Sequence, residues 1–217
     1  MRIPDVCLKW LIGGMVLFMG LATQVTAQVL FDTHTDSKLW LEGSSTIHRF
    51  DCVARSIDGS AFIKGYPNDV PARVNGNDQP DLHVHIRIPI RSFDCGHSRM
   101  NRDMYEALKS DEYDYITFDF EQAERVEGEA SRVSGFFEED YHTYRIRGVL
   151  NIAGVEREVS MVIGGRPDEQ GRYRIRGEKK ISMNDYDVEP PTALRGLIRA
   201  HDNLTVFFDL IVIEQQT

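Results

Sequence analysis

The sequence has few of the residues and motifs that mark enzymes, metal proteins and nucleic-acid binders. It holds three cysteines in 217 residues, and it lacks a nucleophile elbow, a phosphate-binding glycine loop and the HExxH zinc motif. Acidic residues outnumber basic ones and leave a net charge of −9, whereas nucleic acids and anionic membrane surfaces require a basic face. We therefore expect a protein that is not an enzyme, needs no metal or cofactor and binds no nucleic acid.

Long hydrophobic runs are also absent beyond the first residues of the chain. A short basic segment precedes an apolar run at residues 10–21, and the small residues of 25–27 follow it. This order is typical of a cleavable signal peptide, and the run is shorter than the roughly 20 residues of a membrane-spanning helix. We expect 1–27 to be a signal peptide, with an uncleaved anchor as the alternative. Residues 28–217 would then form one periplasmic or secreted bacterial domain without an integral membrane segment.

Cys52 and Cys95 are the two cysteines that remain after the expected cleavage. An even number of cysteines in an exported protein permits one disulfide, and two separate buried thiols are the alternative. Closing a loop of roughly 40 residues would stabilise the fold by about 3–4 kcal/mol in the chain-entropy treatment.

Alternation of apolar and polar residues is the strongest pattern in the chain. In residues 82–91 (LHVHIRIPIR) five apolar side chains share one face, while the histidines and arginines share the other. This period of two predicts a half-buried strand, and Pro89 places part of it at an edge or a bulge. Similar runs predict further strands at 116–121, 144–152, 159–163, 173–183 and 204–210, and shorter or less regular ones at 38–42, 46–55 and 60–66.

A helix is clearly predicted only at residues 99–110 (RMNRDMYEALKS), where Met100, Met104 and Leu108 lie four residues apart. The segment Pro190–Arg199 predicts a second, short helical turn. Many alternating strands with one helix indicate an all-β fold, in which an antiparallel sheet of about eight strands closes into a barrel.

The apolar stripe of the predicted helix must cover something apolar. One interpretation is that it packs over the open end of the sheet as ordinary core. The other is that it forms the lid of a ligand cavity lined by residues such as Phe93, Phe118 and Phe120, because flexible methionines tolerate varied ligands. The residues by themselves leave both interpretations open.

Other polar residues could carry chemistry, but each has a simpler interpretation. His48 could act as a general base or bind a ligand head group, or it could be satisfied by the backbone. His83 and His85 could bind a metal, or they could occupy the solvent face of their strand. Asp185 and Asp187 could be paired carboxylates or calcium ligands, and a turn is the simpler interpretation.

Several stretches together resemble the YceI-like family of lipocalin-like, polyisoprenoid-binding proteins. They include SSTIHRFDC, the segment MNRDMYEALKSDEYDYITFDF and the hairpin GVLNIAGVEREVSMVI. In chain order the matching stretches are residues 44–52, 88–96, 100–120, 148–163 and 181–210. The opening strand is more polar than in many members, and Cys52 and Cys95 match a subgroup with cysteines at these two positions.

The resemblance implies an extended antiparallel lipocalin-like β-barrel with a short helix near one end. It also implies a non-catalytic function, in which the barrel holds the tail of a long amphiphile such as a polyprenyl quinone, a polyprenyl phosphate or a fatty-acid derivative. It therefore favours a cavity over a filled core, and it favours the disulfide between Cys52 and Cys95. A homodimer is a further assembly that we keep open.

We can assign candidate residues to this cavity. The expected wall and lid are Phe93, Met100, Met104, Tyr105, Leu108, Phe118, Phe120, Met183 and Tyr186. The expected head-group contacts are His48, Arg99 and Arg102. Two alternatives remain: an interaction or stress-related protein with a barrel filled by side chains, and an enzyme acting on an amphiphile through His48 with Asp185 or Asp187.

Overall fold

The computed structural model of the chain describes residues 28–64, 81–126, 141–193 and 196–215, so the predicted signal peptide lies outside it. The strands are β1 (Gln28–Thr33), β2 (Lys38–Ser44), β3 (Arg49–Ala54), β4 (Asp58–Lys64), β5 (Asp81–Pro89), β6 (Phe93–Asp94), β7 (Tyr115–Arg125), β8 (His142–Ile152), β9 (Val155–Pro167), β10 (Tyr173–Ser182), β11 (Thr192–Ala193), β12 (Ile198–Arg199) and β13 (Asn203–Glu214). The helices are α1 (Ser98–Ala107) and the 3-10 turns η1 (Ile90–Ser92) and η3 (Asn184–Tyr186).

The main sheet closes on itself as an antiparallel barrel, as the alternating pattern predicts. Its neighbours run in the order β1-β4-β5-β7-β8-β9-β10-β13, and β13 pairs back with β1 to complete a ring of eight strands. Each of these strands is paired on both sides over at least part of its length, and such closure is how barrels limit edge-to-edge association.

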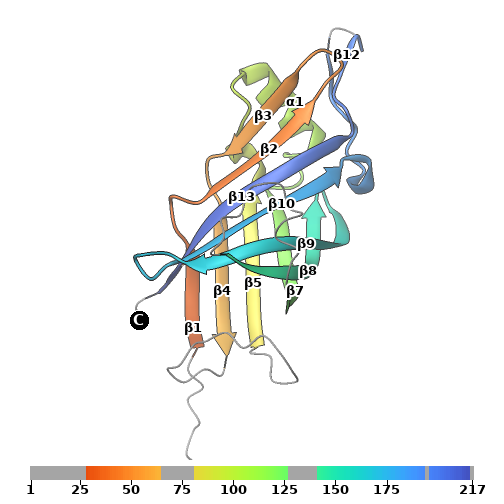
Figure 1. Cartoon of the computed structure of the whole chain (residues 1–217). Helices are drawn as coiled ribbons and strands as arrows, with labels where there is room; N and C mark the ends of the chain where they lie inside the picture. The colour runs from red at the N-terminus through yellow and green to blue at the C-terminus, as the bar shows by residue number, and fades with distance from the viewer. Residues whose placement is uncertain (1–27, 65–80, 127–140, 194–195, 216–217) are drawn as a thin grey trace, which may run out of the picture.

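The barrel is longer on one side because two positions in its wall are each occupied by two short strands placed end to end. β1 and β2 lie along the same edge of β13, with β1 against its C-terminal half and β2 against its N-terminal half. β4 pairs with β1, and β3 pairs with β2, so the break repeats in the next wall position. Figure 1 shows β2 and β3 continuing the wall beyond β1 and β4. The confirmed fold is therefore an extended barrel with two stacked sections on this side.

Helix α1 confirms the predicted helix but ends three residues earlier than expected. Leu108 follows the last helical residue, and Lys109 adopts a left-handed backbone with φ of 53°, which an α-helix does not continue through. The helix lies at one end of the barrel beside β3 (Figure 1). The helix leads from β6 into the turn before β7. Its stripe of Met100, Met104 and Leu108 faces the cavity.

One local expectation was wrong. The segment Pro190–Arg199 forms the short strands β11 and β12, which pair through Thr192 with Arg199, and not a helical turn. The carbonyl of Pro191 accepts a hydrogen bond from the amide of Ala200 at 3.0 Å. The backbone groups of this segment are thus satisfied across a hairpin, and tertiary pairing overrides the local preference of proline for the first helical turn.

The position of Pro89 agrees with the edge prediction. It is the last residue of β5, and the pairing of β5 with β4 stops two residues earlier, at Arg87. The missing N–H of the proline therefore costs no ladder hydrogen bond.

Two clusters of buried residues lie on opposite parts of the interior. The first, here called the disulfide side, contains Leu39, Leu41, Cys52, Ala54, Ile88, Phe93 and Cys95. The second, here called the η3 side, contains Leu150, Ile152, Ala153, Val159, Met183, Tyr186 and Val188. Among the described residues, no helix is both long and apolar enough to cross a membrane.

Candidate functional site

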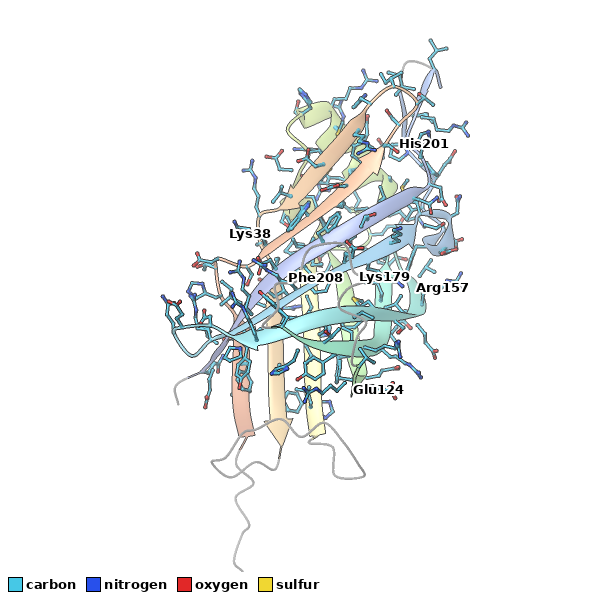
Figure 2. All side chains as sticks on the ribbon, viewed as in Figure 1. Lys38, Glu124, Arg157, Lys179, His201 and Phe208 are labelled. Carbon is cyan, nitrogen blue, oxygen red and sulfur yellow. A yellow bond between two sulfur atoms is a disulfide. The ribbon has the colours of Figure 1, made fainter. Side chains whose placement is uncertain are left out.

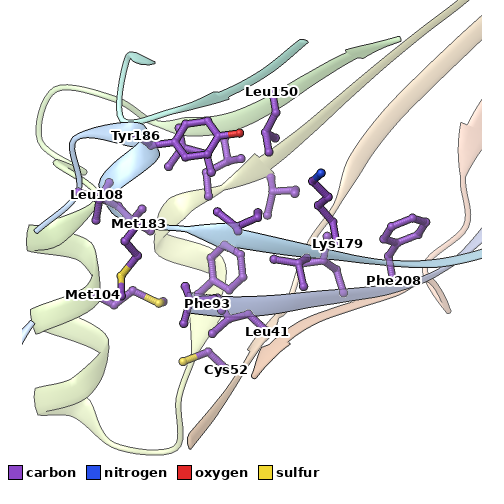
Figure 3. Close-up of a pocket in the computed structure, with 18 of the residues that line it drawn as sticks. Leu41, Cys52, Phe93, Met104, Leu108, Leu150, Lys179, Met183, Tyr186 and Phe208 are labelled. Atoms are coloured by element: carbon purple, nitrogen blue, oxygen red, sulfur yellow. The ribbon is translucent and has the colours of Figure 1, made fainter. Parts of the chain in front are cut away.

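A cavity of about 840 Å³ occupies the inside of the barrel. Its wall is built from the inward positions of the barrel strands, and α1 and η3 contribute side chains at one end (Figure 3). This volume lies within the usual range for sites that hold small organic molecules. The barrel is therefore hollow, and the alternative of a barrel filled by side chains does not describe it.

Inward-facing glycines help to keep the interior open. A Cβ built on Gly177 of β10 would lie 2.4 Å from the ring of Phe208, and one on Gly148 of β8 would lie 2.7 Å from the ring of Phe118. Each phenyl ring thus lies against the backbone of a glycine on the neighbouring strand. A side chain at Gly177 would displace the ring of Phe208, and one at Gly148 would also collide with the backbone carbonyl of Asp119, 2.3 Å away.

Most of the predicted wall and lid residues line this cavity. They are Phe93, Met100, Met104, Leu108, Phe118, Phe120, Met183 and Tyr186. Tyr105 does not line it, and its hydroxyl donates instead to the backbone carbonyls of Phe93 at 2.6 Å and Arg91 at 3.1 Å. Its position on α1 turns it towards β6, so it holds the helix to the wall.

The three predicted head-group contacts are separated by the structure. His48 and Arg99 line the helix end of the cavity, defined here by Ser45, His48, His97, Arg99 and Asp103, whereas Arg102 is exposed on α1 and does not line it. His48 lies 3.5 Å from Ser45 through Nδ1 and Oγ. Arg99 forms an ion pair with Asp103 at 3.8 Å. The basic group that α1 contributes to this end thus has an acidic neighbour one helical turn away.

Lys179 is a cavity residue that the sequence reading missed. It lines the wall from β10, and its Nζ donates a hydrogen bond to the carbonyl of Ser160 on β9 at 3.0 Å. The signal was present in the alternation of residues 173–183. Ile175, Gly177 and Ile181 share the inward face, and Lys179 lies in phase with them.

The disulfide side is fixed by a covalent bond and by a carboxylate. Cys52 of β3 is bonded to Cys95, three residues before α1. Asp94 accepts hydrogen bonds from Asn101 Nδ2 at 3.0 Å, from Arg55, and from the amide of Gly96 at 3.0 Å. These partners, Asn101 first, hold the pKa of Asp94 at about 2, below the ordinary value of 3.8.

No disulfide is present in the described residues of the η3 side, which is held by packing and hydrogen bonds. Asp202 accepts from the hydroxyl of Ser182 at 2.6 Å and from the amide of Asn184 at 2.8 Å, and these bonds lower the pKa of its carboxyl group. Tyr186 is buried at the cavity wall, and burial raises the pKa of its phenol, with the charge of Asp185 adding to the shift. A neutral phenol is therefore the stable form at this wall.

The two histidines considered as metal ligands, His83 and His85, each interact with a nearby side chain. His83 stacks on Phe62 with ring centroids 4.5 Å apart, and His85 Nδ1 lies 2.5 Å from Asp119 Oδ1. Within the described ranges, no group of three or more His, Cys, Asp or Glu side chains could hold a metal ion.

Asp185 and Asp187 form part of a turn. Asp185 belongs to η3, and Asp187 ends it with a left-handed backbone, φ 52°. Neither residue lines the cavity that contains His48. No ion pair joins His48 to a carboxylate in the part of the chain that the structure describes.

These features define a lipocalin-like barrel protein with an apolar internal cavity, and two solved structures share the fold. BcnA of Burkholderia cenocepacia aligns with a TM-score of 0.60 at 15% identity, over 82% of this chain and 96% of that one. A polyisoprenoid-binding domain from Saccharophagus degradans, implicated in plant cell wall breakdown, aligns with a TM-score of 0.59 at 14% identity, over 85% and 98%. A search of curated proteins finds no match.

The profile of the YceI-like domain matches residues 44–211, which cover most of the chain. The protein belongs to the YceI-like family. The resemblance carried by the five sequence stretches is thereby confirmed, and so is the fold class that it implied.

Proposed function

We propose that this protein is an exported, non-catalytic binding protein that holds the apolar tail of a long-chain amphiphile inside its barrel. The observation that carries the proposal is the cavity of about 840 Å³ with walls of aliphatic, aromatic and methionine side chains. Family membership supports it, because one structural relative is described as a polyisoprenoid-binding domain. Isoprenoid, quinone and fatty-acyl chains are the ligand classes that we propose.

The physical reason for such a carrier is the cost of exposing a long tail to water. Each methylene group contributes about 0.8 kcal/mol when it moves from water into an apolar environment. A preformed cavity removes this cost without charged groups along the tail. The signal peptide at residues 1–27 and the periplasmic or secreted location belong to the same proposal, because an extracytoplasmic aqueous compartment is where a lipid requires a soluble carrier.

The test measures the binding of a fluorescent long-chain fatty acid to the mature protein, residues 28–217, after bound lipid has been removed. We expect saturable binding that strengthens as the chain lengthens. Ile86 faces the cavity from β5, and its exposed neighbour Arg87 faces solvent. Ile86→Trp should weaken binding at least tenfold by filling the cavity, whereas the matched variant Arg87→Trp should bind normally.

Native mass spectrometry of protein purified without refolding, followed by lipid extraction, identifies the ligand class and reports the oligomeric state. Repeated recovery of ligand-free protein, together with equal binding by the two tryptophan variants, would contradict the proposal.

A further inference from the structure

The edge shared by β9 and β10 is paired along only part of its length. The two strands pair only between residues 163–167 and 173–177. Beyond these pairs β9 continues along β8, and β10 continues along β13. Figure 1 shows the two strands diverging from the turn that joins them. We call the facing, unpaired segments 155–162 and 178–182 the β9–β10 seam.

Lys179, which is labelled in Figure 2, crosses this seam from the cavity wall. Its neighbours on the same face of β10 include Ile175 and Ile181, which also line the cavity. The side chain is half-buried, and its Nζ reaches the carbonyl of Ser160, 3.0 Å away on β9. Figure 3 shows it among the apolar side chains of the wall, in the region between Leu150 and Phe208. An ammonium group is thus held in a largely apolar part of the cavity wall.

The hydrogen-bonding capacity of Lys179 is only partly used. An ammonium group has three donors, and the carbonyl of Ser160 accepts from one of them. In the described part of the chain, Lys179 forms no ion pair with a carboxylate. A cation placed against apolar surface without a counter-charge is unfavourable. An anionic group in the cavity would supply both the charge and the missing acceptors.

At the helix end of the cavity, in contrast, the positive charge is already paired with a carboxylate. There Arg99 already has Asp103 as its partner, at 3.8 Å, and Asp103 also lines the cavity. An anionic head group at that end would meet a carboxylate as well as a guanidinium. At the seam, the same head group would meet Lys179 and the backbone.

We propose that Lys179 binds the anionic head group, a carboxylate or a phosphate, of the amphiphile in the cavity. This inference rests on the proposed function and narrows its ligand class to tails that end in an anion. The head group would lie at the β9–β10 seam, and the tail would extend along the aromatic wall formed by residues such as Phe118 and Phe208. Charge-assisted hydrogen bonds to the ammonium group would fix its position.

The test compares three probes with the same tail: hexadecanoic acid, hexadecyl phosphate and hexadecanol. With the wild-type mature protein we expect the two anions to bind about tenfold more tightly than the alcohol. Lys179→Met keeps an unbranched side chain that is one heavy atom shorter, and it removes the charge. It should abolish the preference for the anions and leave the affinity for the alcohol unchanged, and Lys179→Arg should retain most of the preference.

Lys180→Met is the matched control, because Lys180 is the exposed neighbour on the same strand and carries the same charge. This variant should keep the full preference. Equal binding of acid and alcohol by the wild type would overturn the inference and leave the proposed function standing. A preference that survives Lys179→Met but disappears in Arg99→Gln or His48→Gln would also overturn it, because the head group would then lie at the helix end. Failure of all three probes to bind would overturn both proposals.

Discussion

The two sides of the cavity are held together by different means. On the disulfide side, a covalent bond between β3 and the segment before α1 fixes the helix that covers the end of the barrel. On the η3 side, the strands β9 and β10 separate, and side-chain hydrogen bonds and packing take the place of ladder bonds. One wall is thus constrained in the unfolded chain as well as in the folded one, whereas the other depends only on native contacts.

The largest expected effect is that of removing the disulfide. The bond closes a loop with a sequence separation of 43, which corresponds to about 3–4 kcal/mol of folding free energy. Cys52→Ala/Cys95→Ala should lose about that much in denaturant unfolding. Hydrogen exchange should rise in β3, β6 and α1 and change little in β9 and η3. Reductant should destabilise the wild type and leave the double variant unaffected, and a loss shared equally by the two sides would contradict the comparison.

Truncating a methionine should cost less stability than removing the disulfide. The cost should be larger on the η3 side than on the helix α1. Met183 is buried beside Tyr186, whereas Met104 of α1 is half-buried. Met183→Ala should cost about 2 kcal/mol and Met104→Ala about 1 kcal/mol, measured by denaturant unfolding. Both lie at the low end for core methionines because each side chain already faces a cavity. If Met104→Ala is the more damaging variant, the helix carries more of the stability than this comparison allows.

Acid should loosen the helix end locally. The pKa of Asp94 is about 2 in the folded protein, below its ordinary value of 3.8. The ionised carboxylate therefore favours the folded form above about pH 4, and this contribution disappears as the pH falls through 2. The protection factors of the amides at the start of α1, which correct for the intrinsic pH dependence of exchange, should fall over this range in the wild type. Asp94→Asn should remove most of that pH dependence, whereas Asp202→Asn should leave it in place and alter exchange around η3.

The smallest effect is expected at alkaline pH. Burial raises the pKa of Tyr186 above its ordinary value of 10, so its ionisation opposes folding. Stability should be unaffected by this group below pH 10 and should fall as the pH rises beyond it. Tyr186→Phe should reduce that alkaline loss, whereas Tyr113→Phe, at an exposed tyrosine, should not. Tyrosinate absorbance during a pH titration would show whether Tyr186 ionises after the exposed tyrosines.

The alternating pattern was a reliable guide to the strands because a half-buried strand must expose alternate residues to the core. It identified β5, β7, β8, β10 and β13, and the four-residue spacing of Met100, Met104 and Leu108 identified α1. Pattern alone did not reveal how strands would be broken or paired. The hairpin of β11 and β12 was missed for this reason, since its pairing depends on contacts with the loop at Thr46, whose amide donates to Arg199.

The candidate site was predicted better in its wall than in its polar groups. Apolar residues in phase with a strand have only one side to occupy, so Phe118 and Phe120 could be placed on the cavity side. Arg102 and Tyr105 lie close to the methionine stripe in sequence, but the angle of α1 against the barrel directs neither into the cavity. Lys179 was overlooked because a lysine within a strand ordinarily indicates its solvent face.

The sequence by itself determined the alternating strands, the place of the helix and most of the apolar wall, because these follow from local periodicity and residue chemistry. The pairing of Cys52 with Cys95 was favoured by the resemblance to the YceI-like family. Only the tertiary structure decided that the barrel is hollow, that β9 and β10 separate and that Lys179 faces the interior. Each of these depends on the distance between strands remote in the chain. Such distances are set by closure of the whole barrel and not by any one segment.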